Sequence, residues 1–398
     1  MRRTAFSVLA CAAVCALVPM SLPSGSALPP QKRPLPAVPE PLKSSLAGFL
    51  RDHAVTPEAY VIGKFRDHDI VILGEHHFIK HDVEFVQSLI PLLYEAGVRD
   101  LAIEFGCREL QDRADALVTA DTYDEALARW IMFQWGSYWP YVEYLGLYRK
   151  AWELNRSLPP GAPKFRIVSL DYRARFDLVR ENMPPAQLKA VWHKGPRDEY
   201  MARTIVDEFV KKRKKALVYM GQHHAFTRYE IPEYDFEKKR FDGLFAGSTG
   251  SFVRRKIGDK VFQICLHYPW TTTAGARTYD YPVDGVVDSL MEESPVRRLG
   301  FDVAGTPFGP LGDEGTLYAL GHKKFTFGDF CDGYIWEKPF GEYEGCTVDP
   351  LCITAENLAE AVANLPSAAV KAKIKTRAQF LEKMRWDADF RRLYPDLQ

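Results

Sequence analysis

Two segments of this 398-residue chain share one arrangement, an apolar run that ends in glycine with a histidine three residues later. They are Asp69-Ile-Val-Ile-Leu-Gly-Glu-His-His77 and Ala216-Leu-Val-Tyr-Met-Gly-Gln-His-His224. A short apolar run closed by a glycine is typical of a buried strand. Each segment therefore predicts a core strand with a histidine at its carboxyl end.

Further apolar runs predict strands at 99–106, 165–171, 260–267 and 331–337. Between the first two predicted strands, residues 82–96 have apolar side chains at helical spacing, followed by Gly97 as a helix stop. A strand, a helix and a strand in this order form a βαβ unit, which makes the strands parallel. The fold class predicted is α/β, a central and mostly parallel β-sheet flanked by helices, with a Gly/Pro-rich irregular region at about 269–325.

Polar side chains occur at the ends of four predicted strands. They are Glu75 and His77 on the first, Glu104 on the second, Asp171 on the third and His224 on the fourth. Ligands of parallel sheets bind beyond the carboxyl ends of the strands, so these side chains predict one shared site.

The chemistry of this residue set is that of hydrolysis. Imidazoles and carboxylates together suit zinc, manganese, cobalt or ferrous iron, with His77, Glu104 and His224 as the expected ligands. A bound metal would activate water, and without a metal a carboxylate-oriented histidine is a base for the same water. The sequence has no Gly-x-Ser-x-Gly motif and no phosphate-binding glycine loop.

Several alternatives stay open at this point. His76 and His223 adjoin the two candidate histidines and are alternative ligands, and Asp171 has Arg173 and Arg175 as structural partners within reach. His81 follows His77 by one helical turn, either as a site residue or as a solvated side chain. The Trp- and Tyr-rich stretch from 130 to 152 predicts aromatic core, with a substrate-lining wall as the alternative.

The ordered motifs Leu73-Gly-Glu-His-His77, Ala102-Ile-Glu-Phe105, Leu170-Asp-Tyr-Arg173 and Met220-Gly-Gln-His-His-Ala225 resemble the erythromycin-esterase-like, ChaN-like and Tiki (TraB-like) superfamily. The resemblance implies a central sheet with an inserted helical layer and a site built from both Gly-x-x-His elements and Glu104. It also implies three activities: metal-dependent proteolysis, lactone hydrolysis, and haem binding. The spacing Glu75-x-His77 is nearer the ChaN-like pattern than the Glu-x-x-His of the esterases.

The leading hypothesis is a hydrolase of an ester, lactone or amide bond in a small-molecule or peptide substrate. A haem- or iron-binding protein with His77 or a neighbouring residue as an axial ligand is the second hypothesis, and a non-catalytic scaffold is the third. The formal net charge of zero gives no reason to expect a nucleic-acid partner.

The chain starts like a secreted protein. Arg2-Arg3, the apolar run that follows them and the small residues before Ala27 predict a signal peptide over 1–27, with a periplasmic or secreted product. Cleavage near Ala27 is favoured over lipidation at Cys11, and no membrane span is expected in the mature chain. In an oxidising compartment, a disulfide is expected among Cys331, Cys346 and Cys352.

The predicted organisation has four parts. A proline-rich leader covers 28–45, the α/β catalytic domain covers 46–345, and a helical extension covers 346–398, after the signal peptide.

Overall fold

The computed structural model describes residues 33–236, 238–274 and 278–397. The predicted signal peptide lies outside these residues. A seven-stranded sheet in the order β10-β11-β7-β1-β4-β2-β3 forms the centre, and every pairing in it is parallel except that of β10 with β11. Its strands are β1 (Ile70–Glu75), β2 (Asp100–Cys107), β3 (Arg166–Asp171), β4 (Ala216–Gly221), β7 (Val261–Leu266), β10 (Leu299–Asp302) and β11 (Gly333–Trp336). This is the predicted fold class.

Two small hairpins and the helices complete the described chain. The hairpins are β5 (Ile231–Asp235) with β6 (Arg240–Phe245), and β8 (Trp270–Thr271) with β9 (Tyr279–Asp280). The helices are α2 (Glu40–His53), α3 (Pro57–Lys64), α4 (Lys80–Glu95), α5 (Gln111–Thr119), α6 (Glu125–Trp135), α7 (Val142–Ser157), α8 (Pro185–Val191), α9 (Arg197–Ile205), α10 (Gln222–Ala225), α11 (Thr249–Ile257), α12 (Val286–Glu292), α13 (Phe327–Phe330), α14 (Leu358–Ala363), α15 (Ala368–Lys373), α16 (Arg377–Asp387) and α17 (Phe390–Leu393). None of these helices is long and apolar enough to cross a membrane.

The strand order explains why two distant motifs meet. β4 lies between β1 and β2 in the sheet, although it follows both of them in the sequence. Glu75 at the end of β1 is paired with Gly221 at the end of β4. The two Gly-x-x-His elements are therefore neighbours at the same edge of the sheet.

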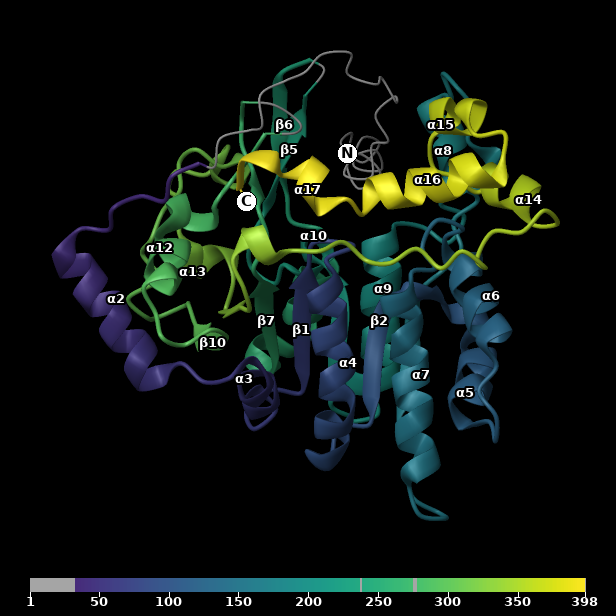
Figure 1. The fold of residues 1–398 in the computed structure, drawn as a ribbon, viewed down its shortest axis with the longest axis horizontal. Helices are drawn as coiled ribbons and strands as arrows, with labels where there is room; N and C mark the ends of the chain where they lie inside the picture. The colour runs from purple at the N-terminus through teal and green to yellow at the C-terminus, as the bar shows by residue number, and fades with distance from the viewer. Residues whose placement is uncertain (1–32, 237, 275–277, 398) are drawn as a thin grey trace.

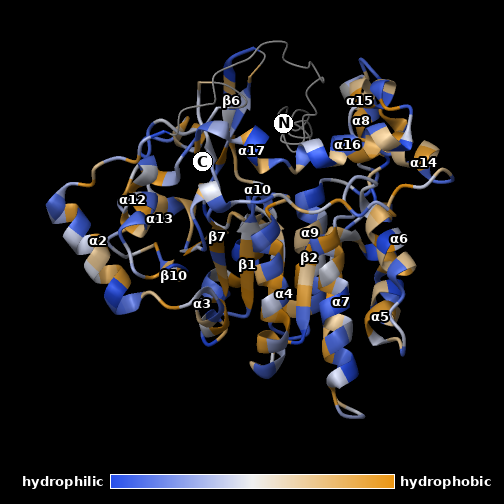
Figure 2. Cartoon of the chain, in the orientation of Figure 1, coloured by the Kyte–Doolittle hydropathy of each residue, from blue (hydrophilic) through white to orange (hydrophobic). Residues whose placement is uncertain are grey.

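The apolar run of β1 serves two cores because successive side chains of a strand point to opposite faces. Val71 and Leu73 pack into the larger core with α4 and α7, whereas Ile70 and Ile72 pack into a smaller core with α9 and α11. Helices α4 and α7 are seen in front of β1 and β2 in Figure 1. The strands are hydrophobic along their length in Figure 2, as expected for a sheet covered on both faces.

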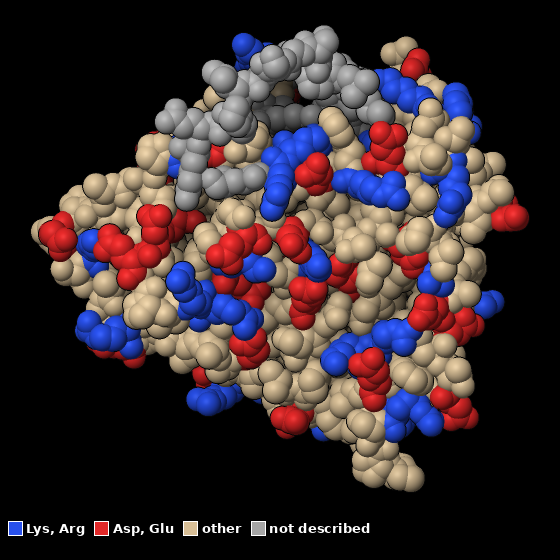
Figure 3. Space-filling view, in the orientation of Figure 1, with Lys and Arg blue, Asp and Glu red and all other residues tan. Residues whose placement is uncertain are grey.

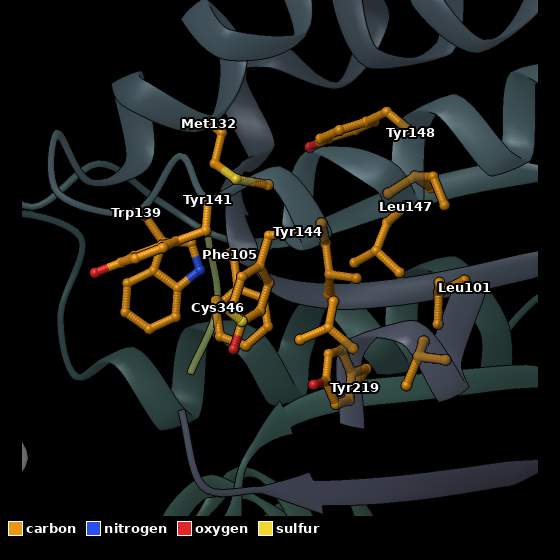
Figure 4. Close-up of a cluster of buried hydrophobic side chains, with 14 of the residues drawn as sticks. Leu101, Phe105, Met132, Trp139, Tyr141, Tyr144, Leu147, Tyr148, Tyr219 and Cys346 are labelled. Carbon is orange, nitrogen blue, oxygen red and sulfur yellow. The ribbon is translucent and has the colours of Figure 1, made fainter. Parts of the chain in front are cut away.

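The aromatic stretch before β3 forms core. Trp139, Tyr141, Tyr144 and Tyr148 are fully or almost fully buried, and they gather with Phe105 and Tyr219 in the cluster drawn in Figure 4. Large aromatic side chains supply much of the buried apolar surface of such a core.

The C-terminal segment crosses the carboxyl edge of the sheet. Helices α16 and α17 run above the ends of β1 and β2 in Figure 1. The hydroxyl of Tyr394 lies 2.9 Å from His76 Nε2, and the hydroxyl of Tyr141 donates to the carbonyl of Met384 at 2.9 Å. This segment therefore packs directly against the loop that follows β1.

Two predictions are corrected by the fold. The region expected to be irregular contains β8, β9, α12 and β10, which are too short to give a clear periodic signal. Cys331, Cys346 and Cys352 are all free and buried rather than joined in a disulfide. Cys331 belongs to a different core cluster from the other two, and Cys352 Sγ lies 3.9 Å from the sulfur of Met384.

Charges of both signs alternate on the surface. On the face in Figure 3, lysines and arginines are interspersed with aspartates and glutamates.

Candidate active site

A carboxylate and a histidine form a pair at the end of β1. Glu75 is the last residue of the strand and is almost fully buried, and His77 lies two residues later in the loop. His77 Nδ1 lies 2.7 Å from Glu75 Oε1, and its side chain is 23% exposed. Because a carboxylate only accepts, Nδ1 is the donor of this contact, and Nε2 lies on the side of the ring away from Glu75.

Two tyrosines hold Glu75 in place. The hydroxyl of Tyr144 donates to Glu75 Oε1 at 2.7 Å, and the hydroxyl of Tyr219 donates to Oε2. Burial and the nearby charge of Glu75 raise the pKa of both tyrosines well above the usual value, so they remain donors. The aromatic cluster predicted as core thus also fixes a site residue through its polar ends.

The glycine of the second motif makes room for the histidine of the first. A Cβ on Gly221 would lie 2.7 Å from Cε1 and 3.0 Å from Nε2 of His77, and 3.4 Å from Glu104 Oε2. Any side chain at Gly221 would displace the His77 ring. A glycine is therefore needed at position 221 to leave room for the His77 ring, which its position at a strand end did not indicate.

His224 is held by a second carboxylate. Its Nδ1 lies 2.7 Å from Oδ1 of Asp198, at the start of α9, and the same oxygen accepts from the backbone N–H of Thr249 at 2.7 Å. Its Nε2 lies 3.4 Å from Glu104 Oε1. Burial opposes the charged imidazole, but Asp198 and Glu104 outweigh it and raise the pKa of His224 to about 9. His224 is accordingly an imidazolium at neutral pH.

Glu104 lies between the two histidines. It lies inside β2 rather than at its end, in the stretch between Ile103 and Cys107 where the pairing with β3 shifts register. Its Oε2 accepts the backbone N–H of Gly221 at 2.9 Å, and its Oε1 accepts from Arg197 at 3.0 Å. Burial would raise the pKa of Glu104, yet the charges of His224, Arg197 and His77 lower it to about 2.

Asp171 joins the same network through Arg197. Its Oδ2 accepts from Arg197 Nε at 2.7 Å and from the indole of Trp135 at 3.1 Å. The expected structural partners do not bind it, because Arg173 pairs with Glu360 and Arg175 pairs with Asp177. Burial raises the pKa of Asp171 in spite of the adjacent guanidinium.

The neighbouring histidines belong to different surroundings. His76 Nε2 lies 2.9 Å from the hydroxyl of Tyr394, and His223 Nε2 lies 3.3 Å from that of Tyr318. Burial lowers the pKa of His76 to about 3 and that of His223 to about 4, so both are neutral. Neither is bonded to Glu75, Glu104 or Asp198.

The predicted metal ligands His77, Glu104 and His224 lie in one network, in which Glu104 binds Arg197 and faces Nε2 of His224. Across the residues that the structure describes, the one group of three possible ligands with donor atoms within 4.8 Å of one another is a different set, His81, Asp82 and Glu337.

Sequence reasoning missed Arg197 and Asp198. Both lie in the first turn of α9, where an acid is favoured by the helix dipole whatever its function. The pattern of strand ends gave no signal for them because they come from a helix. His81 was expected either in the site or in solvent, but it is buried in the first turn of α4, outside the network of Glu104.

No family model matches the chain, and no curated protein matches it in sequence. Solved structures of similar fold do exist. One is a succinoglycan biosynthesis protein, 11% identical with a TM-score of 0.50, where the match covers 78% of this chain and 98% of that one.

Two others match at lower TM-scores. An erythromycin esterase, EreC, is 10% identical with a TM-score of 0.42, over 70% of this chain and 91% of that one. The haem-binding ChaN of Campylobacter jejuni is 15% identical with a TM-score of 0.35, over 55% and 90%. These similarities concern the fold, and the chemistry has to be argued from the residues.

Proposed function

We propose that this protein is a hydrolase in which His77 is the general base that activates water. The observation that supports this most is the 2.7 Å contact between His77 Nδ1 and Glu75 Oε1, which directs the lone pair of Nε2 away from Glu75. A partly exposed imidazole with one nitrogen fixed by a buried carboxylate is the arrangement that base catalysis requires. The bond cleaved is an ester, lactone or amide.

Once His77 has taken a proton from water, two carboxylates would stabilise the resulting imidazolium. Nε2 of His77 faces the backbone of Gly221 next to Glu104 Oε2, while Nδ1 faces Glu75. The imidazolium formed in the reaction therefore lies between two negative charges, which favours its formation in a buried setting. Glu104 is kept ionised for this role by Arg197 and His224.

Arg197 and His224 are assigned a positioning role. Both are bound to Glu104, and each has a second carboxylate, Asp171 for Arg197 and Asp198 for His224. Their charges are satisfied within the protein, so they fix Glu104 rather than contact substrate.

The test compares turnover of the mature chain, residues 28–398, on panels of p-nitrophenyl esters, lactones and peptides. His77→Ala is expected to lower kcat by about 10²–10⁴-fold, the usual contribution of a general base. His68→Ala is the matched control, since this histidine precedes the same strand at the opposite end of the sheet. Equal turnover of wild type and His77→Ala on every substrate cleaved would refute the assignment.

Haem binding is the second candidate, and one observation favours it. The ring of His77 packs edge-on against the rings of Trp139 and Phe105, with ring centroids 4.8 Å and 5.7 Å apart. Nε2 of His77 therefore has aromatic side chains nearby, of the kind that haem contacts. Haem titrated into the mature chain should then give a Soret band that His77→Ala loses and His68→Ala keeps. An identical spectrum in His77→Ala would remove His77 as a ligand.

A further inference from the structure

A second buried polar cluster lies outside the network of Glu104. It consists of His81 and Asp82, in the first turn of α4, and Glu337, which directly follows β11. One ligand atom from each of the three lies within 4.8 Å of the other two. These residues come from segments about 250 positions apart in sequence, so the fold has gathered them.

The cluster is buried, and several of its polar atoms have no hydrogen-bond partner. His81 is 8% exposed, Asp82 1% and Glu337 7%. Within the described chain, both ring nitrogens of His81, Oδ2 of Asp82 and Oε2 of Glu337 lack a hydrogen-bond partner. Buried polar atoms are nearly always paired in folded proteins, and an unpaired buried carboxylate is costly. This concentration of unpaired atoms calls for a ligand.

Neighbouring cations do not supply the missing partner. Arg298 binds Glu337 through Oε1, at 3.0 Å from its Nε, and also binds Glu58, which leaves Oε2 of Glu337 unused. Among the described residues, Lys338 makes no ion pair with Asp82. Asp82 is in contact with His81, whose Nε2 lies 3.4 Å from Asp82 Oδ1, and Oδ2 of Asp82 has no partner.

We propose that His81, Asp82 and Glu337 hold one divalent cation. An imidazole with two carboxylates is a mixed N/O donor set that suits Zn²⁺, Mn²⁺, Co²⁺ or Fe²⁺, and the two carboxylates balance the 2+ charge. Zinc binds nitrogen and oxygen at about 2.0–2.2 Å in tetrahedral geometry, which puts two of its ligands roughly 3.4 Å apart. The donor atoms lie within 4.8 Å of one another, so the side chains must move closer together to bind one ion.

The position of the cluster indicates a structural ion. It would join the start of α4, four residues after His77, to the end of β11 on the other side of β7. The cation would thus anchor the loop that carries the candidate base, without touching it. This site is independent of whether His77 acts in hydrolysis.

The test is elemental analysis of the mature chain, followed by titration of Co²⁺ into the chelator-treated protein. We expect about one Zn, Mn, Co or Fe per chain as isolated, and visible Co²⁺ absorption bands that saturate at one equivalent with a raised thermal midpoint. His81→Ala and Glu337→Gln should each lower the Co²⁺ affinity by at least tenfold. The double variant His77→Ala/His224→Ala should keep the ion.

Asp100→Asn is the matched control because Asp100 is a buried carboxylate at the opposite end of the sheet and is not part of the cluster. It should bind Co²⁺ as the wild type does. If the ligand variants fail to fold, the Co²⁺ titration of the unaltered chain still decides. A wild-type chain with no bound metal and no response to Co²⁺ would overturn the proposal, as would an ion lost only in His77→Ala/His224→Ala.

Discussion

The two Gly-x-x-His elements share one sequence pattern, yet their histidines are held in opposite ways. His77 is partly exposed, with Nδ1 bound to Glu75 of its own motif and Nε2 unbound. His224 is buried, with Nδ1 bound to Asp198 of α9 and Nε2 facing Glu104. The first is equipped to take up a proton, and the second already carries one.

The difference shows that the motif determines where each histidine lies in the fold but not what its imidazole can do chemically. Gly74 near the end of β1 makes room for Gln222, and Gly221 at the end of β4 makes room for His77, so the turns after the two strands pack together at one edge of the sheet. What each imidazole can do is then decided by the carboxylates around it. Both ring nitrogens of His224 face carboxylates, whereas only Nδ1 of His77 is hydrogen-bonded to one.

The largest expected effect separates the two histidines. His77→Ala should lower turnover by about 10²–10⁴-fold with little change in the free energy of unfolding, since its side chain is partly exposed. His224→Ala should lower the free energy of unfolding by about 3–5 kcal/mol, because it leaves Asp198 and Glu104 buried without their cation. Chemical denaturation and kcat measured on both variants check this, and equal stability losses would break the comparison.

Gly221→Ala should give the next largest effect. The added methyl group would lie 2.7 Å from the His77 ring, so the ring must move away from its position between Glu75 and Glu104. Overpacking of this kind costs about 1–3 kcal/mol, and turnover should fall with it. Gly63→Ala on α3 has open space around its Cβ and is the control. A Gly221→Ala chain with full activity would show that the ring position is unimportant.

The third expected effect is a dependence of the free energy of unfolding on pH, which above pH 6.5 should come from His224. Its pKa is about 9 in the folded state and 6.5 in the unfolded chain, so its stabilisation is complete below pH 6.5 and is lost as pH rises through about 9. Glu104 acts in the opposite direction, since its pKa falls from 4.5 to about 2, and its stabilisation is lost below pH 4.5. Each contributes up to about 3 kcal/mol.

The free energy of unfolding, measured from pH 4 to pH 9.5, checks this dependence. The wild type should lose stability between pH 6.5 and 9, and His224→Gln should lose clearly less over that range. Parallel curves for the two chains would mean that His224 is not charged in the folded protein.

Much of the fold could be predicted because the signals are local. Apolar runs closed by Gly74 and Gly221, and the helical stripe of α4, each specify their element within a few residues. The carboxyl-edge position of Glu75, His77, Asp171 and His224 followed from parallel strands alone. The insertion of β4 between β1 and β2 did not, because strand order depends on contacts distant in sequence.

The partners in the site were beyond sequence reasoning for the same reason. Asp171 has two arginines close by in sequence, yet it binds Arg197 of α9. His81 has the helical spacing of a surface residue, yet it is buried against Tyr343, whose ring centre lies 4.4 Å from its own. Such pairings are decided by tertiary packing and leave no periodic trace.

The most direct test of the contrast between the histidines is the ¹⁵N chemical shift of each imidazole in the mature chain at pH 7.5, assigned with His77→Ala and His224→Ala. The account predicts that His224 has both ring nitrogens protonated, whereas His77 has a proton on Nδ1 and a free lone pair on Nε2. A neutral His224, or a His77 with its proton on Nε2, would contradict it.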